Sequence, residues 1–448
     1  MSSLSLNKLA IRGAIWTLIG YGLGQGLRLG SNLILTRILV PEMFGLMAIV
    51  NIFVVGLGMF SDVGLGQSII QHERGEKPDF LNSAWTLQVI RGVILWIICL
   101  FISYPVANYY NEPRLVWYIP VVGLSTIIAG FNSTSLFTLN RQMVLGKITL
   151  LELGIQIISL IVMIVWAWIS PTIWSLVAGN LVSMSLKMLM SHYLLPGIKN
   201  RFAWDKQAIQ DLLNFGRWIF LSTSMMFLSA QADKLILGKL IAFEVLGIYN
   251  NAYIFAEIPQ VITGTISNKV IFPVVSRYSN LPRLEFRQKI LQKRQLILLA
   301  AIPMLVILVS FGDVIIFTLY DARYEQAGWI LPILALGIWP NLLSLTMSPC
   351  LLAVGKPLYA AFGNFLKLCY LLIALPLGFK LMGLLGAVIV VALNDFPFYS
   401  AVYYGLWREK LTAFSQDLQA TTLLISVIIL VFWIRHLFGF GLPIDGIL

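Results

Sequence analysis

Long, continuous apolar segments recur along the whole chain, and they limit the fold more than any other feature of the sequence. A helix needs about 20 apolar residues to cross the hydrocarbon core of a bilayer, whereas barrel strands show about ten residues of alternating polarity. The segments here are longer and unbroken. They run approximately over residues 11–40, 45–71, 82–104, 115–139, 147–170, 172–194, 209–240, 246–271, 295–317, 328–353, 358–380, 384–406 and 419–438. The sequence therefore predicts an all-α integral membrane protein with 12 to 14 transmembrane helices.

The composition excludes an ordinary soluble protein. The chain is 58% hydrophobic and only 11% charged, against about 45–50% and 25% in soluble domains. The three cysteines, Cys99, Cys350 and Cys369, lie within apolar segments and do not indicate a disulfide framework or a metal site. The 31 basic residues are scattered, which argues against a nucleic-acid partner. Neither a phosphate-binding loop nor a nucleophile elbow is present, so ATP-driven transport within this chain is not expected.

Basic residues in the connections predict the orientation. About 18 fall in one set of alternate connections and about 5 in the other, and cytoplasmic loops carry the excess. The N-terminus and the two longest connections, 195–208 and 276–294, are therefore predicted to be cytoplasmic. The segment Pro282–Arg294 reads either as a basic amphipathic helix on anionic headgroups or as a plain orientation determinant.

An internal repeat divides the chain. Residues Leu33–Leu46 align without a gap on Leu235–Ile248, and Trp117 and Pro120 recur as Trp329 and Pro332. Such parallel repeats are typical of transporters that rock around a central site. We expect two pseudo-symmetric six-helix lobes, with boundaries at 1–194 for the N-terminal lobe (spans 1–6), 195–208 for a cytoplasmic linker, 209–408 for the C-terminal lobe (spans 7–12) and 409–448 for an extension with an extra span.

Polar residues form stripes inside two of the predicted spans. They recur every three or four positions, so each set lies on one face of its helix. The stripes are Thr17, Tyr21, Gln25, Arg28, Asn32 and Thr36 in the first span, and Asn250, Tyr253, Glu257, Gln260, Gly264 and Asn268 in the eighth. We expect both to line one water-filled cavity between the halves; polar contacts between tightly packed helices are the alternative.

Ionisable residues within the spans supply the candidate site, because buried charge in a membrane usually marks a pathway. The substrate-binding candidates are Gln25, Arg28, Arg91, Arg217, Asn250, Tyr253 and Lys367. The ion-coupling candidates are Asp62, Asp233, Glu257 and Asp395. Depth along the helices pairs Arg28 with Glu257 and Asp62 with Arg91. Lys367 and Asp395 with Asn394 form a third candidate polar cluster in the eleventh and twelfth spans. Arginine favours a phosphate or pyrophosphate headgroup, but the residues alone do not choose between an anionic substrate and a coupling ion. Lys187 and Lys269 are expected to extend to the membrane surface.

Two motifs resemble those of a known transporter family. The first is FSDVGLGQSIIQ at Phe60–Gln71; the second is GIYNNAY at Gly247–Tyr253, followed by Pro259 and by VIFP at Val270–Pro273. From Gly13 to about Arg408 the chain is similar to the polysaccharide transporter branch of the multidrug/oligosaccharidyl-lipid/polysaccharide (MOP) exporter superfamily. It particularly resembles exporters of the colanic-acid and lipopolysaccharide type.

The resemblance implies a V-shaped, two-lobed bundle in the bacterial inner membrane. It implies a flippase that moves undecaprenyl-pyrophosphate-linked oligosaccharide to the periplasmic leaflet by alternating access, coupled to a proton or sodium gradient. The implied partners are this lipid-linked oligosaccharide, membrane lipids, and the polysaccharide polymerase and export machinery. The superfamily commonly has twelve or fourteen spans, so the thirteenth segment either crosses the membrane or lies in its interface.

Other functions remain as alternatives. A multidrug/cation antiporter or a lipid II flippase belongs to the same superfamily. A polysaccharide polymerase or ligase would need a sizeable outer loop with Arg or His, and the outer connections here have at most about ten residues. We therefore expect a transporter rather than an enzyme, with no cofactor besides a coupling proton or sodium ion.

Overall fold

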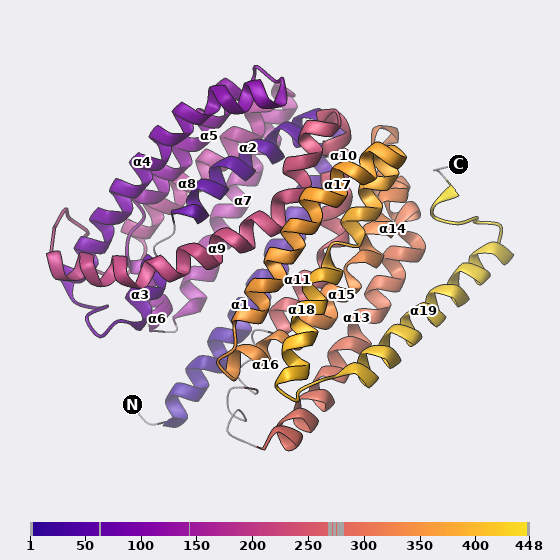
Figure 1. The fold of residues 1–448 in the computed structure, drawn as a ribbon. Helices are drawn as coiled ribbons and strands as arrows, with labels where there is room; N and C mark the ends of the chain where they lie inside the picture. Colours follow the sequence, from indigo (N-terminus) through magenta and orange to yellow (C-terminus); the bar gives the residue numbers. More distant parts are fainter. Residues whose placement is uncertain are drawn as a thin grey trace. The chain divides into compact units, whose positions relative to one another are not determined.

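The computed structural model describes residues 3–61, 64–142, 144–267, 271, 275 and 282–445, and within these ranges it leaves out the side chains of residues 3–15, 17–18 and 213–222. Every regular element in these ranges is a helix (Figure 1). All thirteen predicted spans fall on helices. The prediction of an all-α protein is confirmed.

The chain forms two compact units, Met1–Phe227 and Leu228–Leu448. The helices of the first are α1 (Ser3–Ile38), α2 (Pro41–Phe60), α3 (Leu65–Gln71), α4 (Pro78–Tyr110), α5 (Leu115–Gly130), α6 (Ser135–Arg141), α7 (Leu145–Ile169), α8 (Trp174–Tyr193) and the first part of α9 (Lys206–Leu240). The unit boundary thus lies within α9. The predicted lobe boundary at 195–208 stays a prediction.

The second unit contains the rest of α9 and the helices that follow it. These are α10 (Phe243–Ala256), α11 (Ile258–Ile266), α13 (Arg283–Leu319), the short 3₁₀ helix η2 (Ala322–Tyr324), α14 (Ala327–Gly337), α15 (Trp339–Leu345), α16 (Ser348–Ala353), α17 (Leu358–Ala392), α18 (Asp395–Arg408) and α19 (Phe414–Leu437).

Length and apolar composition allow seven helical stretches of the described residues to cross a membrane: α2, α4, α7, α13, residues 327–353, residues 358–408 and α19. The bent pair α5 and α6 makes an eighth. The stretch 358–408 contains two predicted spans, and the other four predicted spans lie on α1, α8, α9 and α10–α11, which carry more polar residues. The chain is a multi-pass membrane protein.

Several predicted spans are broken helices rather than straight ones. The helix α3 begins after Gly64, whose φ of 61° is a left-handed conformation that suits glycine. The helices α5 and α6 bend by 59°. Within α17, Gly383 has a φ of 60°. Proline stands in the first turn of α11 and α15, where a helix begins without needing its N–H group. Hydropathy averaged over a whole span does not detect these breaks, because the apolar residues on both sides dominate the average.

The two units repeat one packing order. In the first, α5 packs against α2, α4 and α8, α7 packs against α8, and α3 packs against α6. In the second, α14 packs against α10, α13 and α17, α17 packs against α18, and α11 packs against α15. The corresponding helices follow in the same order along the chain. This is the arrangement that the sequence repeat predicts.

A loop motif repeats as well. Before α5, Glu112 Oε1 accepts hydrogen bonds from the backbone N and from Nε of Arg114, at 3.1 and 2.7 Å. Before α14, Asp321 Oδ1 accepts the same pair from Arg323, both at 3.0 Å. The hydrogen bond from the Arg114 guanidinium lowers the pKa of the Glu112 carboxyl. Arg114 also pairs with Glu42 at the start of α2.

The connection 195–208 lies against the first unit. The backbone N–H of Ala203 donates to Thr86 Oγ1 at 3.0 Å, and that of Asp205 donates to Ser83 Oγ at 3.0 Å. Both acceptors are buried at the start of α4. Polar residues at the edge of a predicted span thus satisfy the backbone of this segment.

Candidate functional site

The first unit encloses a polar cavity of about 670 Å³ between the ends of α2 to α8. Its polar lining comprises Gln67, Gln88, Arg91, Thr126, Asn132, Asn140, Glu152 and Lys187. Apolar side chains and several glycines form the rest of the wall. A hollow of this size with a few convergent polar groups is the usual form of a small-molecule site.

Arg91 is held at one wall of this cavity. Its Nε donates to Ser61 Oγ at 2.9 Å, and its Nη2 donates to the carbonyl of Gly58 in the last turn of α2. A cation is favourable there, because the last carbonyl groups of a helix have no intrahelical donor and carry partial negative charge. Asp62, the predicted partner of Arg91, lies outside the described residues.

Gln88 stabilises the break between α5 and α6. Its Nε2 is 3.1, 2.9 and 3.2 Å from the carbonyl oxygens of Ala129, Gly130 and Asn132. The bend interrupts the α-helical hydrogen bonding of this segment, and the amide supplies an additional donor to its carbonyl groups. Close approach of α4 and α5 depends on Gly92, where a Cβ atom would lie 2.5 Å from the carbonyl oxygen of Thr126.

A second cavity, of about 240 Å³, lies between α1 and α7. The predicted residues Gln25 and Arg28 line it, and so does Glu152, which also lines the larger cavity. Gln25 Nε2 donates to Tyr21 OH at 2.7 Å. Among the residues that the structure describes, Arg28 has no ion pair, and its side chain is exposed. The structure thus places three substrate-binding candidates on two adjoining cavities, with the roles of these residues still a prediction.

Glu152 and Lys187 are the charged residues on the lining of these cavities that the sequence reasoning did not select. Lys187 Nζ lies 3.1 Å from Glu152 Oε1, and their side chains are 33% and 52% exposed. Lys187 thus has a carboxylate partner on α7, and the expectation that it extends to the membrane surface stays a prediction. A signal was present: Thr149, Glu152 and Gln156 recur at helical spacing on α7, as on the first stripe.

The second unit buries two of its predicted ion-coupling candidates, Asp233 and Asp395. Tyr249 OH donates to Asp233 Oδ2 at 2.5 Å, and both residues are buried. Lys367 Nζ lies 2.6 Å from Asp395 Oδ1, which also accepts from Asn341 Nδ2 at 3.0 Å. The predicted pairing of Lys367 with Asp395 is confirmed.

The other candidates of this half are less enclosed. Asn250 and Tyr253 are half-buried on α10, with the Lys234 ammonium 4.7 Å from the Tyr253 ring centre. Glu257 lies at the junction of α10 and α11. The side chain of Arg217 and all of Lys269 lie outside the described residues. The predicted pair of Arg28 with Glu257 would join the two units and stays a prediction.

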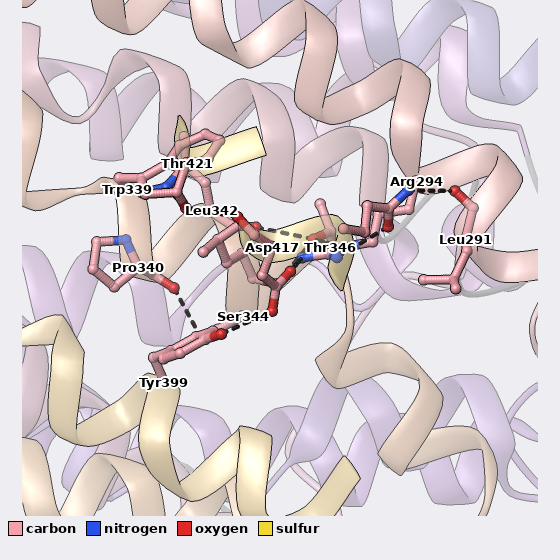
Figure 2. Close-up of polar contacts among 12 residues, drawn as sticks. Leu291, Arg294, Trp339, Pro340, Leu342, Ser344, Thr346, Tyr399, Asp417 and Thr421 are labelled. Carbon is pink, nitrogen blue, oxygen red and sulfur yellow. Dashed lines mark hydrogen bonds and ion pairs between the residues drawn. The ribbon is translucent and has the colours of Figure 1, made fainter. Parts of the chain in front are cut away.

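A buried network fixes the start of α19 to α13 (Figure 2). Arg294 is fully buried, and its Nη2 lies 2.6 Å from Asp417 Oδ1. Its other donors reach Thr346 Oγ1 at 2.8 Å and the carbonyl of Leu343 at 3.1 Å. Tyr399 OH donates to the second carboxylate oxygen at 2.8 Å. Buried charge is tolerated here because each ion has several partners.

A second buried ion pair joins the same two helices at their other ends. Arg435 on α19 donates to both carboxylate oxygens of Asp313 on α13, at 2.9 and 2.7 Å. The residues on α13 are about 28 Å apart and those on α19 about 27 Å apart, at 1.5 Å per residue. The helix α19 therefore runs parallel to α13 (Figure 1).

This pairing bears on whether the thirteenth predicted span, α19, crosses the membrane or lies in its interface. The paired length nearly equals the hydrocarbon core of about 30 Å. A helix lying in the membrane interface could not keep partners at both ends of a crossing helix. The arrangement supports the prediction that α19 crosses the membrane beside α13, which would put its C-terminal end on the side opposite to Pro282; the crossing itself stays a prediction.

Residues 34–328 match the model of a family described as polysaccharide biosynthesis protein. The chain belongs to this family. The match covers well over half of the chain, including the lining of the larger cavity, whereas Gln25 and Arg28 of the smaller cavity precede it. It confirms the resemblance to the polysaccharide transporter branch.

Relatives with assigned names support the same family. The chain is 26% identical over 304 residues to the teichuronic acid biosynthesis protein TuaB of Bacillus subtilis, covering 66% of this chain and 61% of TuaB. It is 24% identical over 279 residues to the lipopolysaccharide biosynthesis protein WzxC of Escherichia coli, covering 61% of this chain and 56% of WzxC. The similarity thus spans about three-fifths of the length of these two relatives.

Solved structures share the fold. The lipid II flippase MurJ in an inward closed conformation superposes with a TM-score of 0.69 at 16% identity, over 95% of this chain and 97% of MurJ. An inward-facing multidrug MATE transporter of the MOP superfamily gives 0.68 at 14% identity, over 86% of this chain and 94% of the transporter. At these identities the likeness establishes the MOP transporter fold alone, as the sequence predicted.

Proposed function

We propose that the chain is a secondary transporter that flips undecaprenyl-pyrophosphate-linked oligosaccharide across the bacterial inner membrane during polysaccharide or lipopolysaccharide export. Membership of the polysaccharide biosynthesis family supports this proposal. So do the names of the relatives, which include a succinoglycan biosynthesis transport protein of Rhizobium meliloti, 23% identical over 354 residues. The flipping follows alternating access and proceeds toward the outer leaflet.

The charge of the two cavities in the first unit carries the proposal. Their lining holds the cations Arg28, Arg91 and Lys187 against the single carboxylate of Glu152 among the described residues. A pyrophosphate diester carries about two negative charges, one on each phosphate, so it would balance this lining. Guanidinium groups bind phosphate oxygens bidentately and stay charged at any physiological pH.

A proton or sodium gradient drives the cycle in this proposal. The intramembrane carboxylates Asp62, Asp233, Glu257 and Asp395 remain its ion-coupling candidates, because acidic groups within spans commonly serve as ion relays. We place the N-terminus in the cytoplasm on the bias of basic residues. A polysaccharide polymerase and the export machinery would act on the product.

A multidrug/cation antiporter and a lipid II flippase share the fold and are the competing functions. The cationic lining argues against the antiporter, since an organic cation would be repelled from Arg28, Arg91 and Lys187. A polymerase or ligase is disfavoured by the short outer connections, such as the one between α4 and α5, Asn111–Arg114.

The test is translocation of an undecaprenyl-pyrophosphate oligosaccharide between leaflets of proteoliposomes, with and without an imposed proton or sodium gradient. Wild type is expected to accelerate flipping, and Arg28→Ala to lose at least about tenfold in rate, the scale of one lost charge-assisted contact. Transport of an organic cation, with no flipping of several glycans under any gradient, would support the antiporter instead.

A further inference from the structure

Glu152 is shared by the two cavities of the first unit. It lies on α7 between the two cavities and contributes to the wall of both. It is the one acidic residue on the described lining of either cavity, which otherwise presents Arg28, Arg91 and Lys187. A carboxylate repels an anionic substrate, so its presence in a proposed anion site needs a reason in the transport cycle.

The pair of Glu152 with Lys187 differs from the buried ion pairs elsewhere in the molecule. Arg294 and Asp417 are 0% and 8% exposed, and several further groups bind them. Lys187 and Glu152 face a cavity, are partly exposed, and meet through one contact of 3.1 Å. Solvated pairs of this kind are weak, so this pair can open at little cost.

We propose that Glu152 is an internal counter-anion that binds Lys187 when the cavity is empty and yields it to a phosphate group of the substrate. This inference rests on the proposed function and adds a regulatory residue to its site. Carboxylate and phosphate oxygens compete for the same ammonium donors. Glu152 therefore keeps free cellular phosphates out of the cavity and, by recapturing Lys187, helps to expel the transported headgroup.

The proposal predicts that removal of the carboxylate tightens anion binding. Inorganic pyrophosphate is the probe, titrated into the full-length purified protein by calorimetry. Glu152→Gln keeps the shape and the hydrogen-bonding capacity of the side chain, and it is expected to bind pyrophosphate roughly three- to tenfold more tightly than wild type, the effect of one nearby charge in a partly hydrated site. Glu42→Gln is the matched control, because it removes one charge from an exposed ion pair with Arg114 outside both cavities. It should bind like wild type.

A second variant tests the route through Lys187. Lys187→Gln should bind pyrophosphate more weakly than wild type, and adding Glu152→Gln to it should restore little affinity, since the released ammonium is absent. A double-mutant cycle over the four proteins measures this coupling. Equal tightening by Glu152→Gln in both backgrounds would show that Glu152 acts through the general field of the cavity and would overturn the exchange.

The flipping assay supplies a readout that a structural role would not give. Glu152→Gln should lower both the substrate concentration for half-maximal rate and the maximal rate, because the headgroup is held longer. Unchanged or weaker pyrophosphate binding by Glu152→Gln overturns the inference, as does the absence of measurable binding to both wild type and the variant. If wild type binds pyrophosphate but flips no lipid-linked oligosaccharide, the proposed function fails while the binding comparison still decides the role of Glu152.

Discussion

The two units use intramembrane charge in opposite ways. In the first, the cations lie on cavity walls, and Lys187 has a partly exposed partner in Glu152. In the second, Arg294, Arg435 and Lys367 are enclosed with their carboxylates and hold helices together. Since a charge that is fully paired and buried cannot readily meet a ligand, we propose recognition for the open charges and architecture for the closed ones.

The largest expected effect concerns the membrane topology that the closed pairs impose. In a protein whose three native cysteines are replaced, Leu442→Cys should react with a membrane-impermeant maleimide in intact cells, whereas Lys199→Cys should react only after the membrane is opened. The reason is that α19 runs parallel to α13, and the start of α13 and the connection 195–208 are both predicted to be cytoplasmic. Labelling of both cysteines from the same side would contradict the crossing.

Breaking the buried network should be the most destabilising single change. Arg294→Met leaves Asp417 as an unpaired buried carboxylate and is expected to cost about 3–5 kcal/mol of unfolding free energy. Thermal unfolding of the detergent-purified protein measures this loss. The double variant Arg294→Met, Asp417→Leu should recover most of it, because neither charge remains. A single variant that unfolds like wild type would remove the network from the architecture.

The pair of Lys367 with Asp395 should give a smaller loss. Asp395→Asn retains a hydrogen-bonding side chain toward Asn341 but leaves the ammonium without its counter-charge, so we expect about 2–4 kcal/mol. Lys367→Met in the same assay tests the other partner. A loss of transport with no loss of stability in either variant would instead assign this pair to the ion-coupling candidates and break the comparison between the units.

The open pair should hardly affect stability. Glu152→Gln is expected to change the unfolding free energy by less than about 1 kcal/mol, since its partner remains hydrated in the cavity. Chemical unfolding of Glu152→Gln and Asp395→Asn side by side provides the direct contrast. Equal losses in the two variants would mean that the cavity charges are architectural too.

The smallest effect is a pH dependence at the surface of the first unit. The hydrogen bond from Arg74 lowers the pKa of the Asp205 carboxyl below its ordinary value of 3.8. The pair therefore contributes stability that is fully present at neutral pH and is lost as the pH falls through the lowered pKa. The melting temperatures of wild type and Arg74→Met should differ most at pH 7 and converge below about pH 4. A gap that widens on acidification would exclude this pair as its cause.

The candidate site was only partly readable from the sequence. Helical spacing found Gln25 and Arg28, because a polar stripe on an apolar helix is a one-dimensional pattern. Sequence reasoning also grouped Lys367 with Asp395, which the structure confirms. It did not find Glu152 with Lys187, because residues 35 positions apart meet only through the packing of α7 on α8.

The sequence by itself determined the membrane environment of the protein, its helical class, its repeated halves and its family. These follow from local hydropathy, charge bias and motif, which need no knowledge of neighbouring helices. Only the tertiary structure decided where apolar spans break, which charges face a cavity and which lie buried, and that α19 runs parallel to α13. The physical reason is that the cost and the use of a charge in a membrane depend on its partners, and those partners come from distant parts of the chain.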